Sequence, residues 1–441
     1  MKRALIILAL ATAPTVVGLS QEVPLTLREC RQQAVANNES LQKADIAARQ
    51  AELDKRVAFA SYLPQLDGSA IALFLKDTDL LSDVELQMRG TYLAELSLTQ
   101  PIFAGGRILY SNKLAKVGQE VAQLQKAKTE QEIIASADAA YYTLVAVRQK
   151  VRMLEAYSRQ MEGLYDQVKT SVDAELATRN DLLRVSAKQS EVEYQLRKAR
   201  NGAEICRLAL CNAMGTDFDT AYVPVDTVFT EGSMRDYSLV PDVDISARPE
   251  VALMEQNVKA YEYKAKIQRG NLLPTVGISL SYGHFDRLKV KGQLTALNGN
   301  VAIPVSYTIN GTNPMGILSI SIPIWHWGTE SNKLRRARYD IETARLDQQQ
   351  NTRLLTIEAR NAAQNLSDSQ NMLETAIIGQ EQADENLRIM RLRFEASLSS
   401  LTDLLDAQSQ WAQAHSNLIE AQTQLRMNES EYLRTIGKLS L

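Results

Sequence analysis

Two stretches of the chain alternate between apolar and polar residues with a period of two. The first contains the apolar positions Tyr92, Ala94, Leu96 and Leu98; the second contains Val276, Ile278, Leu280 and Tyr282 and, further on, Leu318, Ile320, Ile322 and Ile324. Such alternation predicts β-strands whose two faces have unlike surroundings, and we expect β-hairpins over residues 64–102 and 274–325. Strands of about 9–11 residues fit a tilted outer-membrane strand, but a soluble hairpin packed on a core fits the pattern equally well. Polar loops are expected over Lys76–Gly90 and Arg287–Pro314.

The longest segments have a sparse apolar stripe with helical spacing. One seven-residue line in the second half carries Leu355, Ala362, Ala376, Ala383 and Met390. We expect long helical hairpins over residues 107–214 and 329–436, and shorter helices over 25–62 and 248–273. The 64 residues from Glu330 to Arg393 would form a helix about 96 Å long, which exceeds a compact domain. Sparse apolar lines that include small residues are typical of helices packed against their neighbours in a thin wall. A two-stranded coiled coil is the alternative.

The two halves of the chain repeat one another. Three pairs of landmarks share one offset in residue number: Pro101 and Pro323, Leu176–Leu183 and Leu398–Leu405, and Gly215 and Gly437. The arithmetic is 323 − 101 = 222, 398 − 176 = 222 and 437 − 215 = 222. One offset at three points indicates two copies of one unit. The expected organisation is a first repeat over residues 21–215, a connector over 216–247 and a second repeat over 248–441.

Residues 1–20 have the features of a cleaved export signal, because basic Lys2 and Arg3 precede a mostly apolar run. We expect cleavage before Gln21. Loss of Lys2 and Arg3 leaves 47 basic against 52 acidic side chains, a net charge of −5, which argues against a nucleic-acid partner. No later apolar run reaches the about 20 residues of a transmembrane helix. A secreted, a periplasmic and a β-barrel protein remain possible on this basis.

The cysteines and histidines give no sign of a cofactor, a metal site or catalysis. Cys206 and Cys211 point to different faces of one predicted helix, and we expect them and Cys30 to be buried free thiols. His284, His326 and His415 are far apart and lie in no metal-ligand spacing. No nucleophile elbow or phosphate loop is present, so we do not expect an enzyme.

Each half of the chain has the same order of elements: a helix, a hairpin with prolines at its ends, a long helix, a turn and a return helix. This order resembles that of the TolC-like outer-membrane efflux protein family. The matching segments are Asn37–Leu41, Leu63–Pro64, Gln100–Gly106, Ala140–Tyr142 and Thr402–Gln408. The resemblance implies a mostly α fold with a β-barrel. It implies a homotrimer in which each chain gives four transmembrane strands to one barrel in the outer membrane of a Gram-negative bacterium. The long helices would form a tunnel through the periplasm.

The resemblance further implies a passive exit channel for tripartite efflux or type I secretion. The turns between the long helices would narrow the tunnel and dock a periplasmic adaptor, which joins an inner-membrane transporter. Drugs, metal ions and polypeptides are all carried by such channels. A periplasmic coiled-coil adaptor or scaffold is the alternative, although an adaptor would have one helical hairpin and this chain has two.

Three sets of site residues follow. The gate or selectivity residues implied by the resemblance are Asp403, Asp406 and Asp181; for Asp403 and Asp406, helix capping is the alternative role. The expected adaptor-docking turns contain Leu176, Ala177, Thr178, Leu398, Ser399 and Ser400. The aromatic residues expected at the membrane interface, beside outer-membrane lipid, are Phe103, Trp325 and Trp327.

The turns also depart from the family pattern. Glu175 and Ser397 stand where a glycine is common, and Ser399 stands where some members have a basic residue that bonds across the closed tip. Arg179, Arg184 and Arg393 are the arginines that could substitute for it.

Overall fold

The computed structural model describes residues 22–74, 78–81, 84–87, 89–225, 243–295 and 302–441. The expected export signal and residues 226–242 of the expected connector lie outside this set. The chain divides into two compact units: one comprises Met1–Ala44, Lys126–Val251 and Arg353–Leu441, and the other Asp45–Gln125 and Ala252–Thr352.

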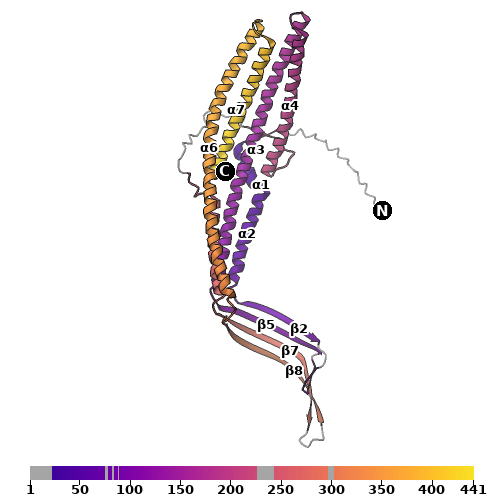
Figure 1. Cartoon of the computed structure of the whole chain (residues 1–441). Coiled ribbons are helices and arrows are strands. Elements are labelled where there is room, and N and C mark those ends of the chain that lie inside the picture. The colour runs from indigo at the N-terminus through magenta and orange to yellow at the C-terminus, as the bar shows by residue number, and fades with distance from the viewer. Residues whose placement is uncertain (1–21, 75–77, 82–83, 88, 226–242, 296–301) are drawn as a thin grey trace, which may run out of the picture. The chain divides into compact units, whose positions relative to one another are not determined.

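Most of the chain is helical, as expected (Figure 1). The long helices are α3 (Arg107–Asp173), α4 (Arg179–Met214), α6 (Thr329–Glu395) and α7 (Leu401–Thr435); the shorter ones are α1 (Leu27–Asn37), α2 (Glu39–Ala60) and α5 (Pro249–Gly270). Helices α3 and α6 each have 67 residues, about 100 Å at 1.5 Å per residue. No helix of the described chain is both long and apolar enough to span a membrane.

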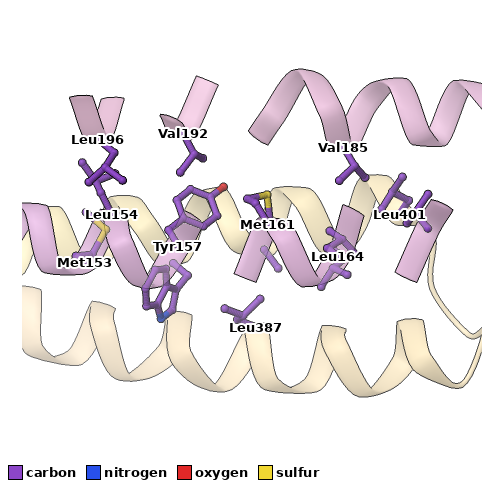
Figure 2. Close-up of a cluster of buried hydrophobic side chains, with 14 residues drawn as sticks. Met153, Leu154, Tyr157, Met161, Leu164, Val185, Val192, Leu196, Leu387 and Leu401 are labelled. Carbon is purple, nitrogen blue, oxygen red and sulfur yellow. The ribbon is translucent and has the colours of Figure 1, made fainter. Parts of the chain in front are cut away.

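The first unit has a core where α3, α4, α6 and α7 meet, which we call the four-helix cluster (Figure 2). Its buried members are Met153, Leu154, Tyr157, Met161, Leu164, Val168, Val185, Val192, Leu196, Leu387, Leu401, Leu404, Ala407 and Trp411. On α3 the positions from Leu154 to Val168 are spaced by alternating threes and fours, which places them on one stripe of the helix. The stripe on α3 therefore fixes how the two helical hairpins pack.

A buried ion pair joins α1 to α3 in the same unit. Arg31 Nε lies 2.7 Å from Asp138 Oδ1, and the Asp138 side chain is only 1% exposed. Ser430 Oγ of α7 donates to Asp138 Oδ2 at 2.6 Å. Removal of one partner from a buried pair of this kind leaves an uncompensated charge, so these contacts fix α1 and the end of α7 on α3.

The single helix predicted over residues 25–62 is wrong, because the chain breaks at Asn38. Asn38 has φ −64° and ψ 125° and ends α1. Its Oδ1 accepts from Ser40 N–H at 2.9 Å, and its Nδ2 donates to Ala213 O at 3.3 Å. Asparagine side chains compete with helical hydrogen bonds in this way. Gly215 lies so close that an added Cβ would be 2.8 Å from Asn37 O, so tertiary packing also sets the break.

The second unit contains a six-stranded antiparallel sheet. Its strands are β2 (Gln65–Phe74), β3 (Thr78–Leu81), β4 (Val84–Gln87), β5 (Arg89–Ala104), β7 (Thr275–Thr295) and β8 (Ala302–Ser321). β2, β5, β7 and β8 are neighbours in that order, and β4 pairs with the later part of β7. In the first unit, β1 (Val23–Leu25) pairs in parallel with β6 (Tyr222–Pro224).

The hairpin tips and one hairpin end differ from the prediction. Most of Arg287–Pro314 lies in β7 and β8, and β3 and β4 occupy part of Lys76–Gly90. Strand pairing uses backbone groups and continues where side-chain alternation is lost, which the prediction did not allow for. β8 ends at Ser321 rather than at residue 325. Pro323 has no N–H with which to extend the ladder.

The strands of the two hairpins pair in the same register. Leu66 pairs with Leu98 in β2 and β5, and Val276 pairs with Ile320 in β7 and β8. These pairs correspond, since 66 + 210 = 276 and 98 + 222 = 320. The positive φ angles of the described residues show the same relation. They occur in four pairs that share the offset of the repeat: Gly105 and Trp327, Gly106 and Gly328, Glu175 and Ser397, and Gly215 and Gly437.

The cysteines are free. Cys30 and Cys211 are buried, as expected, and burial raises the pKa of Cys30 to about 12. The prediction is wrong for Cys206, which is partly exposed because it only borders the cluster around Cys211. Within the described residues, no group of three or more His, Cys, Asp or Glu side chains could hold a metal ion.

Candidate functional site at the turns between the long helices

The turn between α3 and α4 closes with a Schellman motif. Leu176 N–H donates to Ser171 O at 2.8 Å, and Glu175 N–H donates to Val172 O at 3.0 Å. Glu175 adopts a left-handed conformation with φ 57°, in which glycine is usual. This conformation reverses the chain without a longer loop.

The turn between α6 and α7 has the same geometry. Leu398 N–H donates to Arg393 O at 2.7 Å, and Ser397 N–H donates to Phe394 O at 2.9 Å. Ser397 has φ 60°. Glu175 and Ser397, which stand where the family commonly has glycine, are therefore the residues with a left-handed backbone. Each turn keeps its geometry although this residue has a side chain.

Each return helix begins with a capping box. Asp181 N–H donates to Thr178 Oγ1, and Asp181 Oδ2 accepts from Thr178 N–H at 3.2 Å and Oγ1 at 2.7 Å. Asp403 and Ser400 form the same bonds at the start of α7, at 3.1 and 2.8 Å. The sequence pattern of Thr or Ser three residues before an acid predicts such caps. Two of the three candidate gate residues, Asp181 and Asp403, are thus part of helix caps.

These hydrogen bonds favour the ionised form of the two capping carboxylates, because they lower the pKa of each. The hydrogen bond from the Thr178 hydroxyl, followed by that from its backbone, lowers the pKa of Asp181. Ser400 lowers the pKa of Asp403 in the same way, and Arg393 adds a smaller contribution. Both groups are ionised at neutral pH in the single chain. Asp406 lies one turn further along α7 and is exposed, and its Oδ2 accepts from Gln410 Nε2 at 2.9 Å.

The turns leave two leucines in solvent. Leu176 is 83% exposed and Leu398 is 73% exposed. Two residues from the same end of the hairpins, Val185 and Leu401, are buried in the four-helix cluster (Figure 2). Other apolar side chains therefore fill the core at this end of the hairpins, and Leu176 and Leu398 do not contribute to it.

One arginine links the two turns. Arg184 Nη1 donates to Thr402 Oγ1 at 2.8 Å, which joins α4 to the first turn of α7. Of the three candidate arginines, Arg184 is thus one that bonds to the other turn of its own chain. No local pattern in the sequence indicates its partner, since Thr402 lies in the other repeat. The Oγ atom of Ser399 is buried and has no hydrogen-bond partner within the described residues.

The aromatic residues expected at a membrane interface lie at the sheet ends of the second unit. Phe103 is in β5 and is 46% exposed, and Trp325 and Trp327 follow β8 with exposures of 71% and 86%. The two tryptophan rings meet edge to face, with their centroids 5.8 Å apart. Three large aromatic side chains are thus presented to the surroundings.

Comparisons with known proteins support one family. The sequence profile described as "Outer membrane efflux protein" matches residues 30–216 and 241–437. The outer membrane efflux protein BepC of Brucella suis biovar 1 (strain 1330) is 20% identical over 425 residues, which cover 94% of this chain and 86% of BepC.

Solved channels have the same fold. The structure of CusC matches with a TM-score of 0.78 and 13% identity, over 93% of this chain and 92% of that chain. The CmeC outer membrane channel of Campylobacter jejuni matches with a TM-score of 0.74 and 18% identity, over 93% and 85%. The family match covers most of the chain, and this outer-membrane protein therefore belongs to the outer membrane efflux protein family.

Proposed function

We propose that the protein is the outer-membrane exit channel of a tripartite efflux or type I secretion system. Three copies join their sheets into one barrel, and the long helices form a tunnel into the periplasm. The turns at Leu176 and Leu398 dock a periplasmic adaptor that joins an inner-membrane transporter. The channel is a passive conduit, because the chain has no phosphate loop to hold a nucleotide.

The observation that carries the proposal is the sheet of the second unit. One face presents Leu66, Leu96, Leu280 and Leu318, each more than half exposed. The other face is more polar: it carries Ser97, Ser279 and Ser319, together with Ile71 and Ile317. An apolar exposed face suits lipid, and the polar face suits a water-filled interior. A soluble adaptor or scaffold would have no use for such a face.

The sheet also has two edges that need partners. β2 and β8 are its outer long strands, and in the described residues each pairs along one side only. Unpaired backbone groups are very unfavourable in lipid, where a sheet must close on itself. Two copies would supply eight long strands, which enclose little more than side chains. Three copies would supply twelve and leave room for a channel.

The repeat predicts how neighbouring copies pair. Ser97 of β5 pairs with Ser281 of β7 inside the chain. The corresponding residues are 97 + 222 = 319 and 281 − 210 = 71. Ser319 of β8 should therefore pair with Ile71 of the partner subunit. Phe103, Trp325 and Trp327 would lie at the membrane interface, where aromatic side chains are favoured.

The gate is proposed at the start of α7. Threefold symmetry makes Asp403 and Asp406 two rings of three carboxylates, and Asp181 adds charge from the first turn. Rings of acidic side chains favour cations. The exposure of Asp403 and Asp406 supports this role, and the capping bonds of Asp403 and Asp181 are compatible with it.

Membrane fractionation and single-channel recording test the proposal. The protein should be found in the outer membrane and migrate as a trimer on an unheated gel. Purified trimers should form cation-selective channels in planar bilayers. A monomer in the soluble periplasmic fraction, or trimers without conductance, would refute it.

A further inference from the structure

The second unit has a groove between the end of α2 and the start of α3. Asn112 Nδ2 donates to Ala58 O at 2.8 Å, and Lys55 Nζ donates to Gln119 Oε1 at 3.0 Å, so the two helices are in direct contact there. The groove has a volume of about 430 Å³, which is in the range of small-molecule sites. It lies next to the sheet, because α2 leads into β2 and α3 follows β5.

The lining of this groove is basic, although the chain is acidic. Its charged members are Lys55, Arg56, Lys113, Lys116 and Glu52, a net charge of 4 − 1 = +3. The chain without residues 1–20 carries 47 − 52 = −5. Arg56 Nη2 pairs with Glu52 Oε1 at 2.7 Å, so the three lysines are the excess charge.

Within the described residues, carboxylates neutralise little of this charge. Lys116 Nζ lies 3.8 Å from Glu120 Oε1, and the Lys116 side chain is still 65% exposed. Lys113 forms no ion pair in the described part of the chain, and its Nζ lies 5.7 Å from the centre of the Tyr110 ring. Lys55 donates to a neutral amide. The three ammonium groups are therefore available to an added anion.

The groove is apolar at its end next to the sheet and basic further away. Phe59 and Leu109, at the sheet end, are 57% and 45% exposed. Lys113 and Lys116 follow Leu109 by four and seven residues, about 6 and 10 Å along α3. The polar headgroup region of a bilayer is about 5–7 Å thick on each side of the hydrocarbon core. With the sheet in the membrane, the apolar pair therefore lies at the edge of the core and the lysines lie at the level of the headgroups.

We propose that this groove binds an anionic glycerophospholipid of the periplasmic leaflet. The lipid phosphate lies at Lys55, Lys113 and Lys116, and the acyl chains run towards Phe59 and Leu109. Basic pockets beside a membrane bind anionic headgroups, and the apolar end of the groove favours a lipid over a free anion. The proposal needs the sheet to lie in the outer membrane, as the proposed function does, and it adds a lipid ligand held within a single chain.

The second repeat offers a matched control. The basic positions Lys113 and Lys116 recur there, since 113 + 222 = 335 and 116 + 222 = 338 are Arg335 and Arg338. The apolar residue before them does not recur, because 109 + 222 = 331 is Ser331. Attraction by charge alone would act at both places, whereas a lipid that also needs the apolar contact prefers the first.

Native mass spectrometry of the purified protein with added lipid tests the site. The protein should bind phosphatidylglycerol more tightly than phosphatidylcholine with the same acyl chains, by about fivefold or more, the effect of a single cation near a membrane. Lys113→Gln with Lys116→Gln should abolish this preference, and Arg335→Gln with Arg338→Gln should leave it intact. Leu109→Ser should weaken phosphatidylglycerol binding about threefold or more, because it removes an apolar contact.

Three results would overturn the site: equal binding of the two lipids, equal losses in the two double variants, or displacement of phosphatidylglycerol by millimolar inorganic phosphate. The last would show a site for a free anion only. Channel recording in phosphatidylcholine bilayers uses the same preparation and tests the proposed function separately. Normal conductance without lipid discrimination would keep the channel and refute the site. Lipid discrimination without conductance would support the site and count against the channel.

Discussion

Arg184 and Thr402 are joined by a 2.8 Å hydrogen bond between the guanidinium Nη1 and the hydroxyl Oγ1. The bond connects the start of α4 to the start of α7, so it ties together the two turns that we place at the tunnel tip. An exposed bond of this kind contributes about 0.5–1.5 kcal/mol. Its loss would raise the population of a separated tip by about 2- to 10-fold.

Arg184→Ala and Thr402→Val should each increase the frequency of channel opening within that range. The double variant should open no more often than either single one, because both remove one bond. Single-channel recording measures the frequency. Arg179→Ala removes the same charge from the same turn and should have no effect. Equal effects of Arg179→Ala and Arg184→Ala would show that charge, rather than the bond, is responsible.

Replacement of the exposed turn leucines should separate assembly from export. Leu176→Asp with Leu398→Asp should reduce export to background, because a charged turn cannot dock an apolar adaptor surface. Stability should change by less than about 0.5 kcal/mol, since both side chains are exposed. Unheated gels and an export assay report the two properties. Leu176→Met with Leu398→Met keeps the surface apolar and should export normally; unimpaired export by the aspartate variant would disprove the docking role.

Asp406 offers the cleanest test of the selectivity ring. Asp403 also caps α7, so Asp403→Ala would disturb the helix as well as the charge. Asp406→Asn removes one charge per chain and retains an oxygen to accept from Gln410. The reversal potential should shift towards non-selectivity and block by divalent cations should weaken. Glu395→Gln neutralises a charge at the same turn and is the control; an equal shift in both variants would place the constriction elsewhere.

The capping carboxylates predict a pH dependence of the turns. Hydrogen bonds from Thr178 and Ser400 lower the pKa of Asp181 and Asp403 below the ordinary 3.8. A carboxylate with a lowered folded-state pKa stabilises the fold above its unfolded pKa, and this stabilisation is lost as pH falls through the folded value. Opening free energies from hydrogen exchange should therefore be flat between pH 5 and 7 and fall below about pH 4. Thr178→Ala should flatten the response of the first turn; an unchanged pH profile in that variant would exclude the capping mechanism.

The sequence predicted those features that depend on local rules. The constant offset between the two repeats located both turns, and the pairs Thr178 with Asp181 and Ser400 with Asp403 have the spacing of a capping box. Alternation located the strands that carry the exposed leucines of the sheet. Each of these features is encoded within a few residues.

Features that depend on distant contacts were missed or wrong. The break at Asn38 relies on the carbonyl of Ala213, and the extension of β7 and β8 relies on backbone pairing such as that of Val290 with Tyr307. Thr402 had no local signal as the partner of Arg184. No pattern within one segment can show which groups from another segment will lie beside it.

Cross-linking across the sheet edge tests the central claim most directly. A chain with Ser319→Cys and Ile71→Cys should, on oxidation in outer-membrane vesicles, give a covalent trimer on a denaturing, non-reducing gel. Ser319→Cys with Leu73→Cys is two residues out of register and should give little product. A covalent trimer from the first variant and not from the second is the result we predict. Only monomer from the first variant, or equal product from both, would contradict closure of one barrel by three copies.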